Sequence, residues 1–575
     1  MPILKFLFFS PFAAISRHLD LELRISRLLI SAGHQVYFAD CKRDYKKVCI
    51  SMSAHGIGFE DPETQKNKIC NSCINNSLFR SQDLGLMQRS LLNFDAGLEQ
   101  QEIPSLLKKL SQDNWYDYEV GGIPIGKYAA YEFFLKHKLI SNEIPEELWQ
   151  EYTTHFEYSL RTYFSAINFF EKSTDSVDVV LIYNWLYSVN RTFAEVALRN
   201  GVAVYSIHAG SNIEDMYRKL SLHKSSNVPA LQNISPVWKE ISGHPLKFSE
   251  IRNVRKHLFS LTEAKSPWVY SLPKKGVTAN KIREYFKFSQ NSKLVLIGTS
   301  SEDEFFTSRM VGLLDFEKRL PPRVFSTQTE WIDWLIENFG NQQGYDFILR
   351  LHPREFANKR ESVNSKNGIN LVNYFINRLP ENFALNIPED NLSIYDLMGA
   401  ADCLLTQNSS IALESSAFGV PAVGIDLNYV TGFPAESVFV ANSKKEYSDL
   451  IRSAHDREAV QIRQVAAFRW FNYKFNFVES KLHEPSWPIF AILLKILRKL
   501  KYDFNFSIPS SVFRLVNQIS NIWISKSAKK SIGELFEKEL PGLEYVTKKT
   551  QSSRRMHSFI EKLLITRSVR KFLAG

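Results

Sequence analysis

The stretch 402–426, DCLLTQNSSIALESSAFGVPAVGID, decides the fold because it holds a strand, a helix and a second strand in close succession. CLLTQ is a short apolar run typical of a buried strand, SSIALESSAFG predicts a helix that stops at Gly419, and VPAVGID predicts the next strand. Short apolar strands that alternate with helices indicate a parallel sheet with helices on both faces.

The same alternation recurs in both halves of the chain, which has 575 residues. In the first half it appears at ILKFLFFS, LDLELRISRLLISAG and HQVYFAD, and again at VDVVLIYN, NRTFAEVALRNG and VAVYSIHAGS. In the second half SKLVLIG, TEWIDWLIENFG and YDFILRLHPRE precede the opening stretch. The sequence therefore predicts an α/β protein with two Rossmann-like, doubly wound domains that face each other across a cleft. The carboxyl ends of the strands should line this cleft.

We expect the chain to be divided into four parts. The expected parts are a first Rossmann-like domain over 1–265, with a cysteine cluster at 41–73 and a helical insert at 80–175, a linker over 266–285, a second Rossmann-like domain over 286–484, and a basic helical extension over 485–575.

The net charge of +10 is concentrated in the extension. Residues 491–575 hold 17 Lys and Arg against 6 Asp and Glu, so the rest of the chain is close to neutral. A neutral body argues against a nucleic-acid groove, which needs clustered cations. PSWPIFAILLKILRKLKYDF and RRMHSFIEKLLITRSVRKFLAG instead predict basic amphipathic helices on an anionic membrane surface, with an ordinary helical extension as the equally weighted alternative.

The apolar runs of the sequence match neither a membrane-spanning helix nor a signal peptide. None reaches the roughly 18 to 20 residues that span a bilayer. The opening MPILKFLFFSPFAAIS lacks the basic start and the cleavage site of a signal peptide and continues into a strand and helix pattern. We expect a cytoplasmic protein that is peripheral at the inner face of the cell membrane.

Four of the five cysteines, Cys41, Cys49, Cys70 and Cys73, fall in one short segment. In a reducing cytosol such a cluster can supply thiolates for a structural zinc ion. The alternative is a set of small buried thiols in a loop-rich subdomain.

The stretch 120–128, VGGIPIGKY, comes within one residue of a phosphate-binding loop. Such a loop needs Ser or Thr after its lysine and a buried strand before its glycines, but Tyr128 follows Lys127 and a polar segment precedes Gly121. We interpret this stretch as a turn that leads into the helix KYAAYEFFLKHKL.

Three loops at strand ends of the second half carry the candidate ligand-binding residues. RLHPRE places His352 between two arginines, which suits a phosphate oxygen, and SSIALE begins a helix with two hydroxyls and a carboxylate one turn later, where the carboxylate can accept hydrogen bonds from a ribose. An acidic loop, TSSEDE, should line the same cleft. The expected binding residues are Ser301, Asp303, Glu304, Arg350, His352, Arg354, Asn408, Ser409, Ser410 and Glu414.

These motifs resemble a known family. RLHPRE and NIPEDNLSIYDLMGAADCLLTQNSSIALESSAFGVPAVGID are similar to the donor domain of GT-B glycosyltransferases of bacterial surface polysaccharides, particularly the capsule group that includes Kdo transferases. The His-Pro and Ser-Ser pairs are also similar to motifs of bacterial sialyltransferases and CDP-glycerol polymerases. The resemblance is best over 290–430 and weaker in the first half.

The resemblance implies a glycosyltransferase that takes a CMP-, UDP- or GDP-linked sugar and transfers it to a glycan or lipid-linked acceptor. His352, Ser409 and Ser410 would then contact the donor phosphate and Glu414 its ribose, with no metal cofactor needed for the chemistry. In such enzymes the catalytic base usually comes from the first domain, where the candidates are His18, Asp20, His208 and Glu214. The alternatives are a nucleotide-sugar epimerase, a CDP-polyol phosphotransferase and a degenerate domain that acts as an assembly partner.

Overall fold

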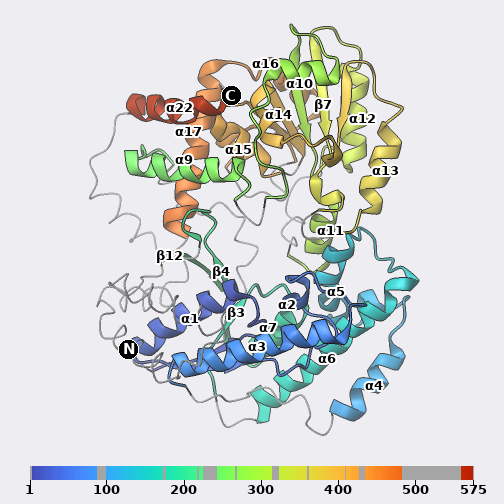
Figure 1. Ribbon diagram of the computed structural model, residues 1–575, viewed down its shortest axis with the longest axis vertical. Helices are drawn as coiled ribbons and strands as arrows, with labels where there is room; N and C mark the ends of the chain where they lie inside the picture. The colour runs from blue at the N-terminus through green and yellow to red at the C-terminus, as the bar shows by residue number, and fades with distance from the viewer. Residues whose placement is uncertain are drawn as a thin grey trace.

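A computed structural model shows two α/β lobes, one above the other (Figure 1). It describes residues 3–86, 99–172, 176–216, 219–224, 238, 242–265, 269–313, 323–358, 362–407, 409–426, 434–478, 480–481 and 558–573. Within these residues, the helices include none whose length and hydropathy would let it cross a bilayer.

The first domain contains a six-stranded sheet in the order β12-β5-β4-β3-β1-β2, in which β2, β1, β3 and β4 run parallel. Its strands are β1 (Lys5–Phe9), β2 (Gln35–Ala39), β3 (Val179–Tyr183), β4 (Ala203–Ala209), β5 (Lys219–Lys224) and β12 (Ser480–Lys481). Its helices are α1 (Ser16–Ser31), α2 (Ile50–Ser53), α3 (Glu63–Asp83), α4 (Glu99–Lys109), α5 (Ile125–His137), α6 (Trp149–Lys172) and α7 (Ser188–Arg199).

The second domain contains a six-stranded parallel sheet in the order β11-β10-β9-β6-β7-β8, the strand order of a dinucleotide-binding fold. Its strands are β6 (Lys293–Gly298), β7 (Tyr345–Arg350), β8 (Phe383–Asn386), β9 (Cys403–Gln407), β10 (Ala422–Ile425) and β11 (Phe439–Ala441). Its helices are α9 (Phe248–Thr262), α10 (Ala279–Phe286), α11 (Glu302–Met310), α12 (Gln328–Phe339), α13 (Lys366–Phe375), α14 (Ile394–Ala400), α15 (Ile411–Phe418), α16 (Lys444–Ser453), α17 (Arg457–Tyr473) and α22 (Ser558–Leu573).

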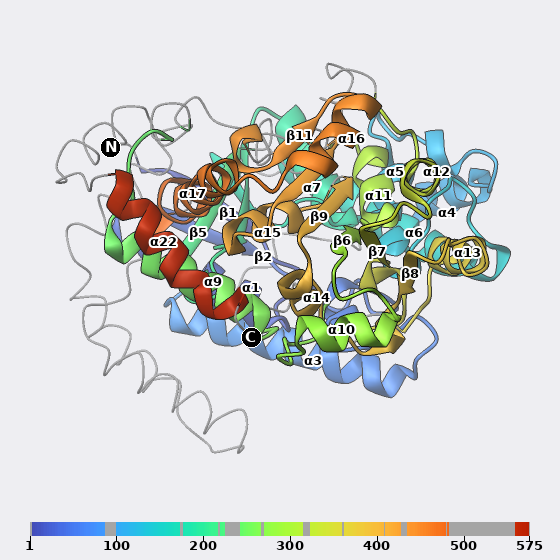
Figure 2. The same ribbon diagram turned by 90° about the horizontal axis from the view of Figure 1, so that it is seen from above.

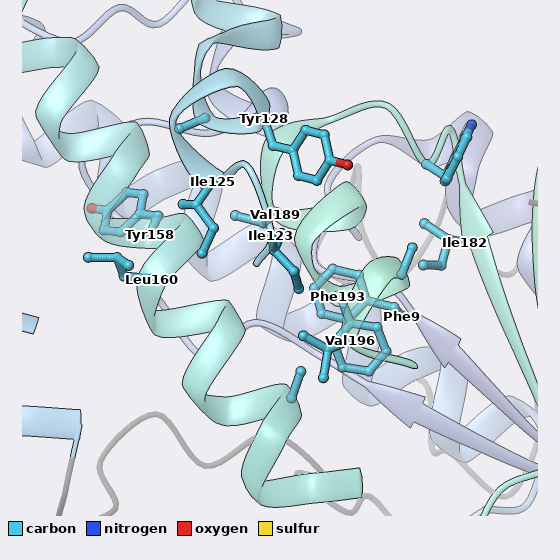
Figure 3. Close-up of a cluster of buried hydrophobic side chains, with 14 of the residues drawn as sticks. Phe9, Ile123, Ile125, Tyr128, Tyr158, Leu160, Ile182, Val189, Phe193 and Val196 are labelled. Carbon is cyan, nitrogen blue, oxygen red and sulfur yellow. The ribbon is translucent and has the colours of Figure 1, made fainter. Parts of the chain in front are cut away.

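The strands form where the sequence supplies unbroken apolar runs, because both faces of each sheet are covered by helices. In the first domain the rings of Phe9 on β1 and Phe193 on α7 stack at 4.3 Å, and Ile182 and Ile123 pack beside them (Figure 3). At the end of α1, Gly33 has a φ of +94°, which favours glycine and lets the chain turn into β2. The predicted architecture of two doubly wound domains is confirmed.

The domain boundaries differ from the prediction at both ends of the second domain. The helix α9 was expected in the first domain, but Val254 and Leu258 pack in the core shared by the second sheet, α15 and α17. The strand β12 pairs antiparallel with β5, so the chain returns to the first sheet after α17. The helix α22 also differs from the expected membrane helix, because its apolar residues Ile565 and Val569 are buried in the second domain. The earlier part of the extension, 482–557, lies outside the described residues.

The carboxyl ends of both parallel sheets face the opposite domain. The helix α11, which follows β6, packs against α5 of the first domain, where the rings of Phe306 and Phe134 stack at 6.0 Å (Figure 1). The turn after β4 contacts α9, since the backbone N–H of Ile213 donates to Nδ1 of His257 at 3.2 Å. Residues at these strand ends are therefore placed at the interface between the domains.

Candidate functional site

The loops after β6, β7 and β9 lie together at the carboxyl edge of the second sheet. The backbone N–H of His352 donates to Oγ1 of Thr299 at 2.8 Å, and Oγ of Ser300 donates to the backbone oxygen of Gln407 at 2.7 Å. This edge contains the point where the strand order reverses between β6 and β9, which is where open α/β sheets bind ligands. The three loops expected to line one site are therefore brought together.

His352 follows β7 as a neutral hydrogen-bond donor. Its Nδ1 accepts the backbone N–H of Arg354 at 3.3 Å, so the ring proton of the neutral imidazole lies on Nε2. Burial, together with the charges of Arg354, Arg350 and Lys138, lowers the pKa of His352 to about 3. The side chain can therefore donate one hydrogen bond to a phosphate oxygen without carrying a charge at neutral pH.

Arg354, one of the predicted binding residues, bonds within the protein in this structure. Its side chain is only 3% exposed, and its Nε and Nη2 donate to the carboxylate of Asp303 at 3.0 and 2.8 Å. Nη2 also donates to the backbone oxygen of Leu135 on α5, and Nη1 to the hydroxyl of Tyr270. Arg354 thus joins the loop after β7 to the first domain.

The side chain of Arg350 also hydrogen-bonds within the protein. Its Nη1 donates to Oδ1 of Asn386 at 2.5 Å, at the end of β8 and away from the loop after β9. Burial lowers the pKa of Arg350 to about 10, opposed by Asp390 and Glu389. Its contribution to the predicted site is electrostatic, through the pKa of His352.

The acidic side chains of the loop after β6 also interact within the protein. Oγ of Ser301 donates to Asp303, which is 1% exposed and occupied by Arg354. The exposed Glu304 lies 3.5 Å from Nε of Arg354. The first turn of α11 holds three acidic side chains. The partial positive charge at the N-terminus of this helix is therefore close to carboxylates of the helix itself.

The helix α15 begins at the two serines, as predicted. Ser410 is its exposed N-cap residue, and the Ser410 side chain makes no capping hydrogen bond. Oγ of the half-buried Ser409 accepts the backbone N–H of Ile411 at 3.5 Å. A helix start with two hydroxyls suits an anion. Asn408 lies outside the described residues.

Glu414 lies one turn into α15 and is partly buried. Its Oε2 accepts a hydrogen bond from the hydroxyl of Tyr395 on α14 at 3.0 Å. Burial raises the pKa of Glu414 to about 7, against the lowering effect of Tyr395. A carboxylate at this depth can accept hydrogen bonds from vicinal hydroxyls of a sugar, and each such bond would favour its charged form.

Two of the four candidate bases of the first domain come together. The ring of His18, in the first turn of α1, stacks on Tyr183 at 3.7 Å, and the ring of His208 on β4 lies 5.7 Å from the same tyrosine. Burial lowers the pKa of His18 to about 3, with smaller contributions from His208 and Arg17, and burial lowers the pKa of His208 to about 4. Both imidazoles are neutral at pH 7 and can accept a proton.

Asp20 and Glu214 do not join this pair. Asp20 is exposed, two positions after His18 on α1 and therefore on another side of the helix. Glu214 is exposed in the turn after β4, where it accepts the hydroxyl hydrogen bond of Ser260 on α9. Asp20 and Glu214 therefore lie apart from the two histidines, and their role as the base stays a prediction.

The structure gives no support to the predicted zinc site. Within the described residues no group of three or more His, Cys, Asp or Glu side chains is placed to hold a metal ion. Sγ of Cys73 accepts the backbone N–H of Ala14 at 3.2 Å, and burial raises the pKa of Cys41 and Cys49. Cys70 and Cys73 are buried and Cys41 and Cys49 are partly buried, and thiols whose pKa is raised stay protonated at neutral pH.

The stretch 120–128 is a turn followed by α5, as interpreted from the sequence. Gly121 and Gly122 have positive φ, and Arg199 donates to their backbone oxygens. A Cβ at Gly126 would lie 1.8 Å from the backbone oxygen of Trp115, so glycine is needed for close packing rather than for a phosphate.

The sequence analysis missed several residues beside the candidate site. Lys138 ends α5 in the left-handed region with a φ of 54° and donates through Nζ to the backbone oxygens of Phe356 and Val363 at 2.7 and 2.5 Å. His223 lies near His208 because β5 pairs with β4. No local motif marks either residue, since both act through contacts between distant segments.

Comparisons with known proteins give only remote similarities. No protein-family profile matches the chain, and no curated protein matches it at a significant level. Similar solved structures include the UDP-GlcNAc 2-epimerase from Neisseria meningitidis bound to UDP-GlcNAc, which is 12% identical, with 86% of this chain and 100% of that chain covered and a TM-score of 0.28.

Two glycosyltransferases are similar to a comparable degree. The β-Kdo 2,4 transferase KpsC from Thermosulfurimonas dismutans is 13% identical, with 52% of this chain and 80% of that chain covered and a TM-score of 0.28. SnogD from Streptomyces nogalater is 12% identical, with 82% and 99% covered and a TM-score of 0.23. At these scores the function of this chain has to be argued from its own residues.

Proposed function

We propose that the chain is a glycosyltransferase that moves a sugar from a nucleotide-activated donor to a surface polysaccharide or lipid-linked glycan acceptor. The observation that supports this most is the arrangement at the switch point of the second sheet. There a neutral imidazole follows β7, and a helix start with two hydroxyls and a carboxylate one turn later follows β9, on the other side of β6. The neutral histidine pair is supplied by the other domain.

Each group has a role in this proposal. The Nε2 proton of His352 and the first turn of α15 with Ser409 and Ser410 would stabilise the leaving phosphate, whose charge grows as its bond to the sugar breaks. Glu414 would hold the ribose. His18 or His208 would take the proton of the acceptor hydroxyl as its oxygen bonds to the anomeric carbon. These groups need no metal cofactor to neutralise the leaving group.

The partners follow from these roles. The donor is a CMP-, UDP- or GDP-linked sugar, because a carboxylate that contacts ribose does not select the base. A lipid-linked acceptor would place the protein in the cytoplasm at the inner face of the membrane, with the basic segment 485–557 held against anionic lipid. Nucleic acid has no part in the proposal.

The first test is a thermal-shift panel of CMP, CDP, UDP and GDP with the wild-type chain and His352→Ala. A ligand at a hundred times its Kd stabilises the folded state by about 2.7 kcal/mol. Loss of the imidazole hydrogen bond should weaken the preferred nucleotide by about 1.5 to 3 kcal/mol, or roughly tenfold to a hundredfold. Stabilisation by none of the four nucleotides would contradict the proposal and favour a degenerate assembly partner.

The reaction class is tested with the nucleotide sugar that the panel selects. A transferase should consume the donor only when an acceptor glycan is present. Conversion of the donor sugar without any acceptor would identify an epimerase instead. Transfer of a polyol phosphate from a CDP-linked donor would identify the phosphotransferase alternative.

A further inference from the structure

The helices α9 and α22 lie side by side on the outside of the second domain, as both ribbon views show (Figures 1 and 2). They begin together, because the Glu561 carboxylate in the first turn of α22 accepts the backbone N–H of Leu246 at 2.7 Å, just before α9. The same carboxylate pairs with Arg469 of α17 at 2.5 Å. With Ile565 and Val569 in the core, α22 is a fixed part of the domain surface.

Large apolar side chains remain exposed on these two helices. Phe248, the first residue of α9, is 60% exposed, and Ile560 and Leu563, one turn apart on α22, are 43% and 39% exposed. On α22 these two residues lie opposite the buried stripe. Several exposed apolar side chains on neighbouring elements mark an interaction surface better than scattered ones do.

The same two helices carry exposed cations. Arg252 and Lys256 are exposed on α9, and Arg567 is exposed on α22. Among the residues that the structure describes, none of these three side chains forms an ion pair. We refer to Phe248, Arg252, Lys256, Ile560, Leu563 and Arg567 as the α9–α22 face.

The acidic groups of this region are already engaged. Glu250 accepts the backbone N–H of Lys247 at 2.8 Å as part of the start of α9, and Glu561 is buried with Arg469. Glu263, just past the end of α9, lies 2.5 Å from Nζ of Lys265. The α9–α22 face therefore presents positive charge to its surroundings.

We propose that the α9–α22 face binds an anionic lipid surface. Cations attract acidic headgroups, while exposed Phe, Ile and Leu side chains gain free energy by entering the boundary between headgroups and acyl chains. Nucleic acid would use the cations but not the exposed aliphatic side chains. The binding goes beyond sugar transfer, because it needs no group at the interface between the domains.

The positive charge is complementary to phosphatidylglycerol, and another part of the sequence has the same character. The segment 489–501, which precedes α22 in the chain, alternates apolar residues with lysine and arginine, although it lies outside the described residues. A membrane held against α9 and α22 would contact the folded second domain directly.

The experiment measures binding of the full-length chain to vesicles of phosphatidylcholine with and without phosphatidylglycerol. Removing three cations in Arg252→Gln/Lys256→Gln/Arg567→Gln should weaken binding to the acidic vesicles roughly a hundredfold. Phe248→Ser/Leu563→Ser should weaken binding roughly tenfold and leave its salt dependence unchanged. Thermal unfolding of each variant verifies that the fold is intact.

A matched control removes three exposed lysines of the first domain, in Lys46→Gln/Lys108→Gln/Lys109→Gln. It should change vesicle binding less than twofold. The proposal is overturned if the α9–α22 variant binds acidic vesicles as well as the wild type does. It is also overturned if binding is lost only when Lys495, Arg498, Lys499 and Lys501 are neutralised. The same holds if a DNA oligonucleotide competes with the vesicles and this competition requires Arg252 and Lys256.

Discussion

At the carboxyl edge of the second sheet, side chains of one strand end hydrogen-bond to the backbone of another: Thr299 accepts the backbone N–H of His352, and Ser300 donates to the backbone oxygen of Gln407. At the same edge of the first sheet, His208 bonds to Ser206, two residues away on its own strand, and the histidine rings meet around a tyrosine. The second edge is therefore fixed by contacts between strands, as a binding site requires. The first edge holds neutral imidazoles whose nitrogens can still accept a proton.

This comparison predicts that the two edges control different steps, and the largest effect is expected at the first edge. His18→Ala should lower kcat by about 10² to 10⁴, the usual contribution of a positioned base. The Kd of the nucleotide should change less than twofold, since the donor would contact the second edge. Steady-state kinetics and nucleotide titration measure the two quantities separately.

His208→Ala and His223→Ala are the controls for this prediction. If His18 is the base, each should lower kcat far less than His18→Ala does. A large loss in His208→Ala alone would move the role to His208. Unchanged kcat in all three variants would remove the base from this edge altogether.

The second-largest effect concerns Arg354, which the sequence suggested as a phosphate ligand. Arg354→Met should lower the free energy of unfolding by about 3 to 5 kcal/mol, because it leaves Asp303 charged and buried without its ion-pair partner. Asp303→Asn/Arg354→Met should regain part of this loss. Denaturant unfolding checks both variants, and a stable Arg354→Met variant that only fails to bind nucleotide would restore Arg354 as a ligand.

The arginines show where the sequence stops being informative. The position of His352 could be predicted because an apolar strand followed by proline fixes a strand end locally. The direction of Arg354 could not, because its partner Asp303 lies 51 positions away and its third contact comes from the other domain. Arg350 likewise depends on Asn386, 36 positions away.

The helix α22 shows the same limit for amphipathic patterns. Its alternation of apolar and basic residues fits either a membrane surface or a protein core, and only the structure shows that Ile565 and Val569 face α9 and α17. The strands and helices themselves were predictable, because two covered sheets need continuous apolar runs separated by helices of ordinary length.

Glu414 provides a third and smaller test, through pH. Its pKa is raised by burial to about 7 from an ordinary value of 4.5, so the folded state favours the protonated form. This contribution to stability is complete below pH 4.5 and is lost as the pH rises through 7. Glu414→Gln should therefore unfold like the wild type near pH 4.5 and be more stable by about 1 to 3 kcal/mol at pH 8.

The same substitution should weaken nucleotide binding at pH 8, because a glutamine replaces the carboxylate that would accept the ribose hydroxyls. Stability and affinity then change in opposite directions. Thermal unfolding without ligand and nucleotide titration, each at pH 5 and pH 8, measure both. Equal stability of the two proteins at pH 8 would show that the charged form of Glu414 does not destabilise the folded state.

The smallest expected effect distinguishes the two lysines at the ends of α5. Lys138→Met removes both hydrogen bonds to the loop that carries His352 and should weaken nucleotide binding about fivefold, equivalent to about 1 kcal/mol. Lys127→Met should leave the Kd unchanged, because Lys127 lies against Tyr116 and Asp117 in the turn that resembles a phosphate loop. A larger loss in Lys127→Met than in Lys138→Met would place the phosphates at that turn and reverse the comparison between the two edges.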